Sequence, residues 1–386
     1  MATSVAAQQA VITTDGLDQL ISVLRERGWS VLGPVLRDGV IAPGEVTGVD
    51  DLPRGVGDDQ QPARYRLRER GDDALFGFAS PATSFKPVLF PPRQLLWRAT
   101  ARDDGFDMTR PDAAPPRRAL LGVRSCDLAA IRAQDRVLAH RWKDRPGRDV
   151  DYVAARDATF VVAVACGSPA DTCFCTSMGT GPAPGEGYDL ALTEVLADEH
   201  RFVVTVGSER GADVLDEVGN RVADHDDVAA AQSVIDGATR AIERRLDTTG
   251  LPAMLDAEVE HPLWEDVAQR CLACGNCTAV CPTCFCTSVD DVSDLTAENA
   301  ERWRTWDSCF TAGFSYVHGG PVRASTASRY RQWMTHKLGT WQAQFGSSGC
   351  VGCGRCLTWC PVGIDITAEA RALRGTARTS RREDTT

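Results

Sequence analysis

The stretch Cys271-Leu-Ala-Cys274-Gly-Asn-Cys277-Thr-Ala-Val-Cys281-Pro282 returns with the same spacing as Cys350-Val-Gly-Cys353-Gly-Arg-Cys356-Leu-Thr-Trp-Cys360-Pro361. This is the ligand spacing of a pair of 4Fe-4S clusters, in which three closely spaced cysteines bind one cluster and the fourth binds the other. The sequence therefore predicts two 4Fe-4S clusters and a meeting of two distant segments. The predicted ligand sets are Cys271, Cys274, Cys277 and Cys360 for one cluster, and Cys350, Cys353, Cys356 and Cys281 for its neighbour.

Structural zinc and a disulfide framework are the alternatives for so many cysteines. A zinc site closes with four ligands, usually two pairs roughly 12 to 20 residues apart. Neither alternative accounts for two matched runs that each end in Cys-Pro. The chain begins MATSVAAQQA, without the basic and apolar regions of a secretory signal. We therefore expect a reducing cytoplasm, in which thiolates serve as metal ligands.

Composition narrows the class of protein further. The chain has 386 residues, enough for two or three domains, and a net charge of −11 that argues against nucleic acid as a partner. Its longest strongly apolar run, residues 160–166, is too short to span a bilayer, so no membrane attachment is expected. Nearly all the positive charge is arginine, and we attribute this to genome composition. The only lysines are Lys86, Lys143 and Lys337.

Hydrophobic patterns predict an α/β N-terminal region followed by an all-helical two-cluster ferredoxin-like domain. A strand at 119–123, a helix at 127–138 and a strand at 160–165 have the order of a parallel α/β unit. A largely helical stretch is expected at 296–345, between the cysteine runs, and the end of the segment 85–99 also has a helical pattern. The expected divisions are 1–225 for the α/β domain, 226–372 for the helical dicluster domain, and 373–386 for a disordered tail.

Four further cysteines are candidates for a third 4Fe-4S cluster. Cys126 and Cys166 each end a predicted parallel strand, so both are expected at one edge of the sheet, where open α/β sheets place their ligands. Cys173 and Cys175 follow in the next loop. The alternative is that Cys126 and Cys166 are small buried hydrophobic residues, as free cysteines often are.

A short repeat, TCFCTS, occurs at 172–177 and again at 283–288. The second copy contributes Cys284 and Cys286, and Cys309 follows later. These three could hold a further cluster with His318 as a fourth ligand. The interpretation that we prefer is that they pack around the paired clusters and tune their potential through hydrogen bonds.

Four segments carry a resemblance to a known family: 120–138 (LLGVRSCDLAAIRAQDRVL), 271–286 (CLACGNCTAVCPTCFC), 306–310 (WDSCF) and 349–366 (GCVGCGRCLTWCPVGIDI). They resemble the beta subunits of cytoplasmic sulfhydrogenase-type nickel-iron hydrogenases, a family that includes the A subunit of anaerobic sulfite reductase. The resemblance implies a non-catalytic electron conduit within an oxidoreductase complex. Its implied partners are the large and small nickel-iron hydrogenase subunits and a flavin subunit that exchanges electrons with NAD(P)H.

The absence of nucleotide motifs agrees with this division of labour. The chain has neither a G-x-G-x-x-G fingerprint nor a G-x-x-x-x-G-K-[ST] loop. One alternative keeps the fold but delivers electrons to a sirohaem sulfite reductase. Another is an iron-sulfur redox sensor, although no DNA-binding element or basic surface is recognisable.

Overall fold

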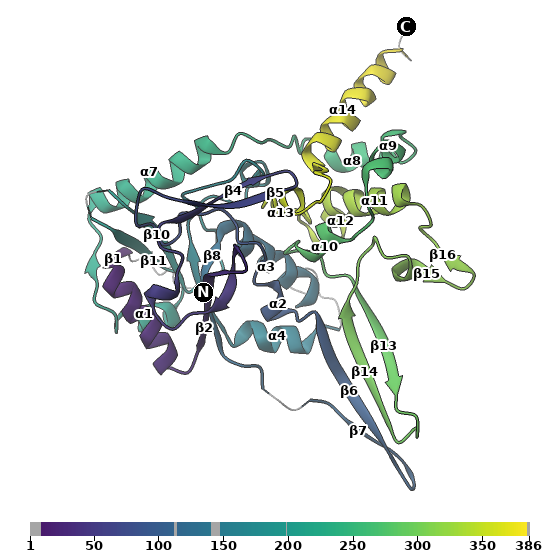
Figure 1. Ribbon diagram of the computed structural model, residues 1–386, viewed down its shortest axis with the longest axis horizontal. Helices are drawn as coiled ribbons and strands as arrows, with labels where there is room; N and C mark the ends of the chain where they lie inside the picture. The colour runs from purple at the N-terminus through teal and green to yellow at the C-terminus, as the bar shows by residue number, and fades with distance from the viewer. Residues whose placement is uncertain (1–8, 112–113, 140–146, 198, 384–386) are drawn as a thin grey trace, which may run out of the picture.

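The computed structural model describes residues 9–111, 114–139, 147–197 and 199–383. Residues 1–8, Lys143 and residues 384–386, on which some expectations fell, lie outside these ranges. Figure 1 shows a large body from which two elements project, a long β arm and the C-terminal helix α14 (Ile366–Glu383). Within the described ranges, no helix is long and apolar enough to cross a membrane.

An eight-stranded mixed sheet forms the centre of the body, in the order β12-β1-β11-β10-β9-β8-β2-β3. Its strands are β1 (Gln9–Thr13), β2 (Ser30–Arg37), β3 (Val40–Glu45), β8 (Arg118–Arg124), β9 (Thr159–Val164), β10 (Leu190–Val195), β11 (Arg201–Val206) and β12 (Arg221–Val222). The neighbours β2 and β8, β8 and β9, and β9 and β10 run parallel. Of these, the pair β8 and β9 is the one that the strand-helix-strand pattern predicted. The other neighbouring pairs are antiparallel.

Helices cover both faces of this sheet. On β9, Phe160, Val162 and Val164 face one core with α1 (Thr14–Glu26) and α6 (Glu209–Leu215). The alternate residues Val161 and Ala163 face a second core with α2 (Lys86–Leu89), α3 (Ser125–Leu138) and α4 (Val150–Asp157). This burial on both faces explains why β9 is a continuous apolar run rather than an alternating one.

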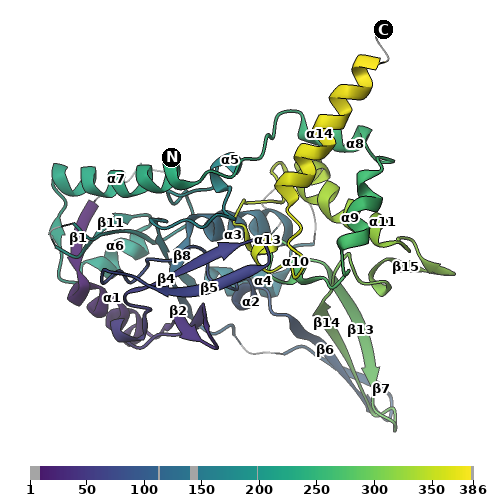
Figure 2. The same cartoon turned by 45° about the horizontal axis from the view of Figure 1, so that its top comes forward.

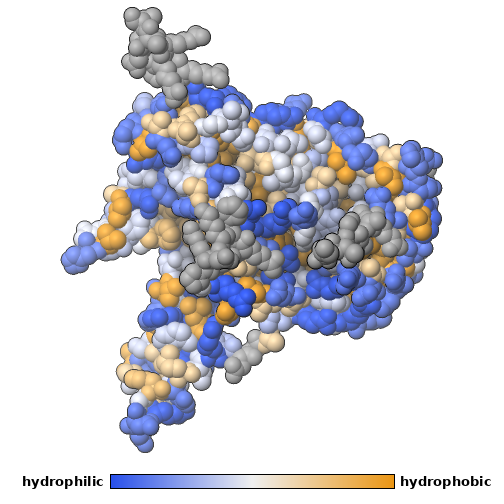
Figure 3. All heavy atoms as spheres, turned by 180° about the vertical axis from the view of Figure 1, so that it is seen from behind, coloured by the Kyte–Doolittle hydropathy of each residue, from blue (hydrophilic) through white to orange (hydrophobic). Residues whose placement is uncertain are grey.

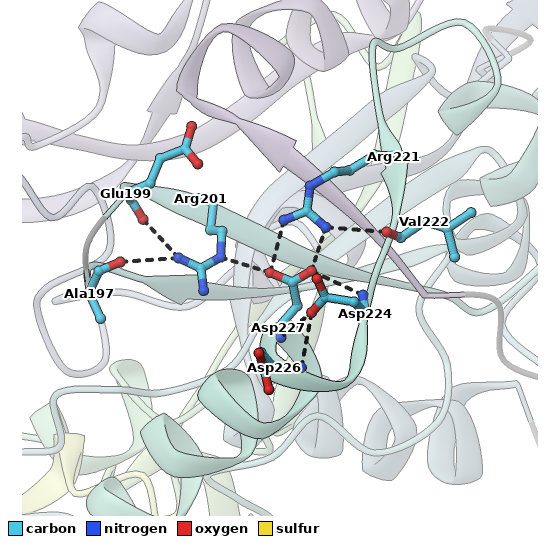
Figure 4. A network of polar contacts seen from close by, with 8 residues as sticks. All are labelled: Ala197, Glu199, Arg201, Arg221, Val222, Asp224, Asp226 and Asp227. Atoms are coloured by element: carbon cyan, nitrogen blue, oxygen red, sulfur yellow. Dashed lines mark hydrogen bonds and ion pairs between the residues drawn. The ribbon is translucent and has the colours of Figure 1, made fainter.

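Helix α7 (His225–Ala241) covers the β1, β10 and β11 end of the sheet and is fixed there by one carboxylate. Asp227 accepts hydrogen bonds from Arg201 Nε at 3.0 Å and from Arg221 Nη2 at 3.0 Å, while Asp224 caps the helix (Figure 4). The hydrogen bond from Arg221 is the main cause that lowers the pKa of Asp227 far below its usual range. The network is structural and lies away from the cysteines.

The β arm is a four-stranded sheet in the order β13-β14-β6-β7, built from two hairpins distant in sequence. Its strands are β6 (Arg93–Arg102), β7 (Gly105–Thr109), β13 (Thr287–Ser293) and β14 (Asn299–Trp306). Figures 1 and 2 show it projecting from the body, and Figure 3 shows hydrophobic side chains gathered where the arm meets the body.

The arm corrects the predicted fold class, because the C-terminal region is not all-helical. The end of 85–99, predicted to be helical, is part of β6. Of the stretch 296–345, also predicted to be helical, the first half contains β14 and the small hairpin of β15 (Tyr316–Val317) and β16 (Gly320–Pro321), whereas 326–345 is helical as predicted. Residues 299–306 are rich in helix-favouring Ala, Glu and Arg. Pairing with β6 overrides that propensity through cross-strand contacts. Arg302 stacks on Trp97 at 4.8 Å, and Arg98 donates to Glu301 at 2.8 Å.

Short helices form the rest of the C-terminal region. They are α8 (Leu251–Ala257), α9 (Leu263–Arg270), α10 (Asn276–Ala279), α11 (Thr326–Thr335), one π-helical turn (His336–Thr340), α12 (Trp341–Phe345), α13 (Arg355–Thr358) and α14. They pack around a core that includes Trp264, Tyr330, Trp333 and Leu373. The segment expected to be a disordered tail from residue 373 continues α14 as far as Glu383. A two-stranded ribbon, β4 (Val56–Gln61) and β5 (Arg64–Glu69), lies beside α13.

Candidate metal centres

The two cysteine runs adopt the same loop conformation. The N–H of Ala273 donates to Cys271 Sγ at 3.4 Å, and the N–H of Gly352 donates to Cys350 Sγ at 3.4 Å. Both donors have positive φ, 50° and 66°. The glycine after the second cysteine of each run, Gly275 or Gly354, also has positive φ and begins a short helix, α10 or α13. A left-handed residue is needed at this point to curl the chain around a bound group.

The first candidate site lies at the surface and draws on both runs. One pocket is lined by Cys271, Cys274 and Cys277 together with Cys356 and Cys360 from the opposite run. Cys274 is exposed, and the others are partly buried. The N–H of Ile364 donates to Cys360 Sγ at 3.3 Å. The structure therefore brings together the four residues predicted for one cluster.

The second candidate site lies deeper. Burial raises the pKa of Cys350 to about 12, and the nearby thiols of Cys353 and Cys281 also raise it. Burial likewise raises the pKa of Cys356 well above its usual range, with the thiols of Cys350, Cys353 and Cys281 as further causes. Cys281 from the first run therefore lies near the cysteines of the second run, and the thiol of Cys277 also raises the pKa of Cys356. The assignment of Cys281 as a ligand of the second cluster stays a prediction.

A buried ammonium group lies against this second site. Lys337 Nζ is 3.1 Å from Cys281 Sγ and 3.5 Å from Cys284 Sγ, and it also donates to Thr283 Oγ1 at 3.3 Å. A hydrogen bond with Cys284 is the main cause that lowers the pKa of Cys281, and the charge of Lys337 acts in the same direction. Although burial opposes the charge of Lys337, the thiols of Cys281, Cys284 and Cys350 raise its pKa above the usual range.

The four cysteines considered for a third cluster also gather in one place. Cys126 lies in the first turn of α3, directly after β8, and Cys166 follows the neighbouring parallel strand β9. Burial raises the pKa of Cys173 well above its usual range, and the thiols of Cys166 and Cys175 raise it further. Cys126, Cys173 and Cys175 pack with Cys353 in one buried cluster. The third group therefore adjoins the second site.

Tight loop contacts hold the third group against the second run. The N–H of Phe174 donates to the carbonyl of Gly352 at 2.9 Å, and the hydroxyls of Thr172 and Thr358 lie 3.0 Å apart. A Cβ added to Gly352 would lie 2.7 Å from the Cα of Cys175, and one added to Gly354 would lie 2.5 Å from the carbonyl oxygen of Thr172. Only glycine permits this approach of the two backbones.

Two buried arginines lie at the junction of the second and third groups. Arg355, between Cys353 and Cys356 in the sequence, forms a two-pronged ion pair with Asp127 at 2.6 and 2.7 Å. Arg124, at the end of β8, donates to the carbonyls of Phe76, Phe78, Ala79 and Ala165. Its charge is a cause that lowers the pKa of Cys166 against the larger effect of burial, which raises it.

The remaining cysteines lie between the arm and the paired sites. Cys284 and Cys286 line a pocket with Cys274, Lys86 and Trp306. Burial raises the pKa of both Cys286 and Cys309. The thiol of Cys286 raises the pKa of Cys309 further, whereas a backbone hydrogen bond from Cys309 lowers the pKa of Cys286. His318, considered as a fourth ligand, is exposed in the turn between β15 and β16.

The thiols of the candidate sites stand apart from one another. Across the described residues, no three His, Cys, Asp or Glu side chains converge closely enough to hold one metal ion. A 4Fe-4S cluster holds its cysteines further apart, because each thiolate binds a different iron. The N–H donors to sulfur and the glycines in the loops fit a cluster held close to the backbone.

The spacing of the cysteines gives no indication of the two buried cations, Arg355 and Lys337. Arg355, within Cys-Gly-Arg-Cys, resembles an exposed loop residue, and only the fold reveals that Asp127 is its partner. Lys337 did carry a signal, because it is one of three lysines in a chain that otherwise uses arginine. That rarity could have drawn attention to its position.

Two comparisons with known proteins agree with this geometry. The family model described as a 4Fe-4S dicluster domain matches residues 270–364, which contain both cysteine runs. Sulfhydrogenase 2 subunit beta of Pyrococcus furiosus is 34% identical over 255 residues, which are 64% of this chain and 71% of the relative. The chain therefore carries a 4Fe-4S dicluster domain for two clusters, the type of cofactor used in electron transport.

Proposed function

Since this chain belongs to the family of the sulfhydrogenase beta subunits, we propose that it relays electrons within a nickel-iron hydrogenase complex, between the hydrogenase module and a flavin subunit. The observation that supports the proposal is the closeness of the two cysteine runs: Cys360 lines a pocket with the first run, and the thiol of Cys281 lies near Cys356 of the second. When bound, 4Fe-4S clusters take up and release single electrons.

We assign the ligands as two crossed sets. The first is Cys271, Cys274, Cys277 and Cys360, and the second is Cys350, Cys353, Cys356 and Cys281. The lining of the surface pocket supports the first set, and the mutual proximity of the buried thiols supports the second. The crossing ties the two runs together, so each set depends on both segments.

We further assign Cys126, Cys166, Cys173 and Cys175 to a third 4Fe-4S cluster. The support is that two cysteines at the ends of adjacent parallel strands and two in the next loop gather beside Cys353. Their side chains and the apolar residues Ala79, Ile242 and Val351 exclude water from this part of the chain. Such a cluster would extend the electron path from the surface at Cys274, past the second site, into the α/β body.

The proposed partners follow from the family. They are the large and small nickel-iron hydrogenase subunits and a flavin subunit that exchanges electrons with NAD(P)H, while this chain has no nucleotide motif of its own. The isolated chain should oxidise neither NAD(P)H nor hydrogen. Anaerobic affinity purification, with identification of the co-purifying chains, tests the partnership. Recovery of a sirohaem sulfite reductase instead would replace the hydrogenase assignment.

Iron analysis tests the cluster assignment. Anaerobically reconstituted protein should hold about twelve irons per chain if three cubanes are present and about eight if there are two. Replacing Cys126, Cys166, Cys173 and Cys175 together with alanine should remove about four irons and leave the paired clusters. Unchanged iron content and an unchanged paramagnetic resonance spectrum would identify these four as packing residues.

A further inference from the structure

Lys337 is brought to the second site by an irregular piece of backbone. It lies in the π-helical turn His336–Thr340, between α11 and α12. π-Helical turns are rare in proteins, and a large share of those that exist lie at functional sites. The carbonyl of Lys337 accepts from the N–H of Gly349 at 2.9 Å, so the residue is fixed to the loop that begins the second cysteine run. Its position is therefore built into the dicluster domain.

The charge of Lys337 has no carboxylate partner among the described residues. The side chain is 4% exposed, and Nζ lies near the sulfurs of Cys281 and Cys284, the hydroxyl of Thr283 and the carbonyl of Gly349. By contrast, buried Arg355 is paired with Asp127. An isolated buried ammonium is costly unless an anion lies beside it. The anion-forming groups within its reach are the thiol of Cys281, which belongs to the second site, and the neighbouring thiol of Cys284.

The choice of lysine also has a physical reason. Among the basic residues, 42 in all, lysine stands at three positions only. An ammonium is a compact charge with three donors, whereas a guanidinium is a broad planar fork suited to carboxylates. Contacts to two sulfurs, a hydroxyl and a carbonyl suit the ammonium.

We propose that Lys337 sets the reduction potential of the cluster bound by Cys281, Cys350, Cys353 and Cys356, and makes it the first cluster of this chain to be reduced. The inference rests on the proposed function, since it requires a cluster at the second site. Reduction adds one electron and one negative charge, and no bond forms or breaks. The ammonium and its N–H···S contact with Cys281 stabilise the reduced form more than the oxidised form, because potentials depend on net charge and on hydrogen bonds to sulfur.

The direct test replaces Lys337 with methionine, which keeps an unbranched side chain of similar length without the charge. In an anaerobic redox titration followed by paramagnetic resonance, one cluster should become at least tenfold harder to reduce at a fixed potential, a shift of 59 mV for a one-electron couple. Lys337→Gln separates the effect of the positive charge from that of the hydrogen bond to sulfur, because the amide retains an N–H donor but has no charge. A shift below twofold in both variants, with iron content intact, would overturn the proposal.

Lys86→Met is the matched control. Lys86 is also buried, but among the described residues its Nζ contacts the carbonyl of Cys284, to which it donates at 3.2 Å, and the Trp306 ring, whose centre lies 3.7 Å away, rather than a cysteine sulfur. Its replacement should shift the potential less than replacement of Lys337. An equal or larger shift would assign the effect to general positive charge in this region and would overturn the specific role of Lys337.

A measurement on the protein with Lys337 in place keeps the proposal testable if the variants lose iron. Growth with lysine labelled by ¹⁵N at Nζ marks three side chains, and in the Lys86→Met protein only those of Lys143 and Lys337. At a potential that reduces only the cluster at the second site, pulsed paramagnetic resonance of the Lys86→Met protein should show a nitrogen coupling that changes with the label. No change would refute the proposal. Absence of any second cluster by iron analysis would instead refute the assignment on which it rests.

Discussion

Arg355 and Asp127 form a fully buried ion pair, with side chains 0% and 2% exposed. Arg355 follows Cys353 by two residues and Asp127 follows Cys126, so the pair joins the second and third groups of cysteines. Removing one partner of a buried pair leaves the other charge without compensation, which typically costs about 3–5 kcal/mol. The pair therefore holds the two candidate sites in fixed relation.

We expect Arg355→Met to lower the thermal unfolding midpoint strongly and to reduce the iron content at both the second and third sites. The exposed pair of Arg102 and Asp107, at 3.1 Å on the arm, provides the control, since exposed pairs contribute little. Arg102→Met should leave the midpoint nearly unchanged. Equal midpoints for the two variants, measured at one scan rate, would show that the buried pair has no special structural role.

At this scale the sequence predicts which cysteines lie near one another better than it predicts the residues that surround them. Cysteine spacing predicted that Cys360 lies with Cys271 and Cys281 with Cys350, because the geometry of a cluster imposes that spacing. No local pattern reveals that Arg355 finds Asp127 or that Lys337 reaches Cys281. Those contacts join residues from different elements, so they depend on how the elements pack.

Between elements, the contact of the TCFC loop with the second cysteine loop depends on glycine. Gly352→Ala should weaken this contact, because the added Cβ would meet the backbone of Cys175 at 2.7 Å. Gly179 is a matched control in the same region, with nearly the same φ, 65° against 66°, and no atom within 4 Å of an added Cβ. Both alanines incur a backbone cost of about 1 kcal/mol, and only Gly352→Ala adds a clash of about 1–3 kcal/mol. Iron content and the thermal unfolding midpoint should fall more in Gly352→Ala than in Gly179→Ala. Equal falls in the two variants would show that the close contact between the two loops has no structural role.

The attachment of α7 to the sheet provides a prediction about pH. The arginines lower the pKa of Asp227 in the folded state, so its ionised form stabilises the fold above its unfolded pKa of about 4. That contribution is lost only as pH falls below about 4, towards the folded value. We expect Asp227→Asn to expose α7 amides to faster hydrogen exchange, with a destabilisation of about 1–2 kcal/mol. After correction for intrinsic exchange rates, the difference should stay constant from pH 5 to pH 8; a difference that varies across this range contradicts the assignment.

Elements with strong local patterns were predicted correctly, and those decided by distant partners were not. The apolar strands β8 and β9 carry their own signal because both faces are buried. By contrast, β6 and β14 have helix-favouring residues, and their pairing joins segments about 200 residues apart in sequence. Non-local pairing of this kind leaves little trace in a window of neighbouring residues.

In the molecule as a whole, the candidate sites run from the surface inwards. Cys274 of the first site is exposed, whereas Cys350 and Cys353 of the second are each 8% exposed, and Cys126, Cys173 and Cys175 are also buried. Cys356 of the second group and Cys166 of the third are partly buried. This order suits a conduit whose outer end is open to a partner. It also makes the sites unequal in their resistance to oxygen and chelators.

We therefore expect iron to be lost from the first site before the others during brief exposure to air and chelator. Cysteines freed at each stage can be alkylated and identified by mass spectrometry, with the denatured protein as the reference for complete labelling. Cys271, Cys274 and Cys277 should be modified early, whereas Cys350, Cys353 and Cys356 should be modified late. The two crossed cysteines make the test decisive. Cys360 should be modified early, with Cys271, although it belongs to the second run in the sequence. Cys281 should be modified late, with Cys350, although it belongs to the first run. If Cys360 is labelled in step with Cys356, each run binds its own cluster and the crossed assignment is wrong.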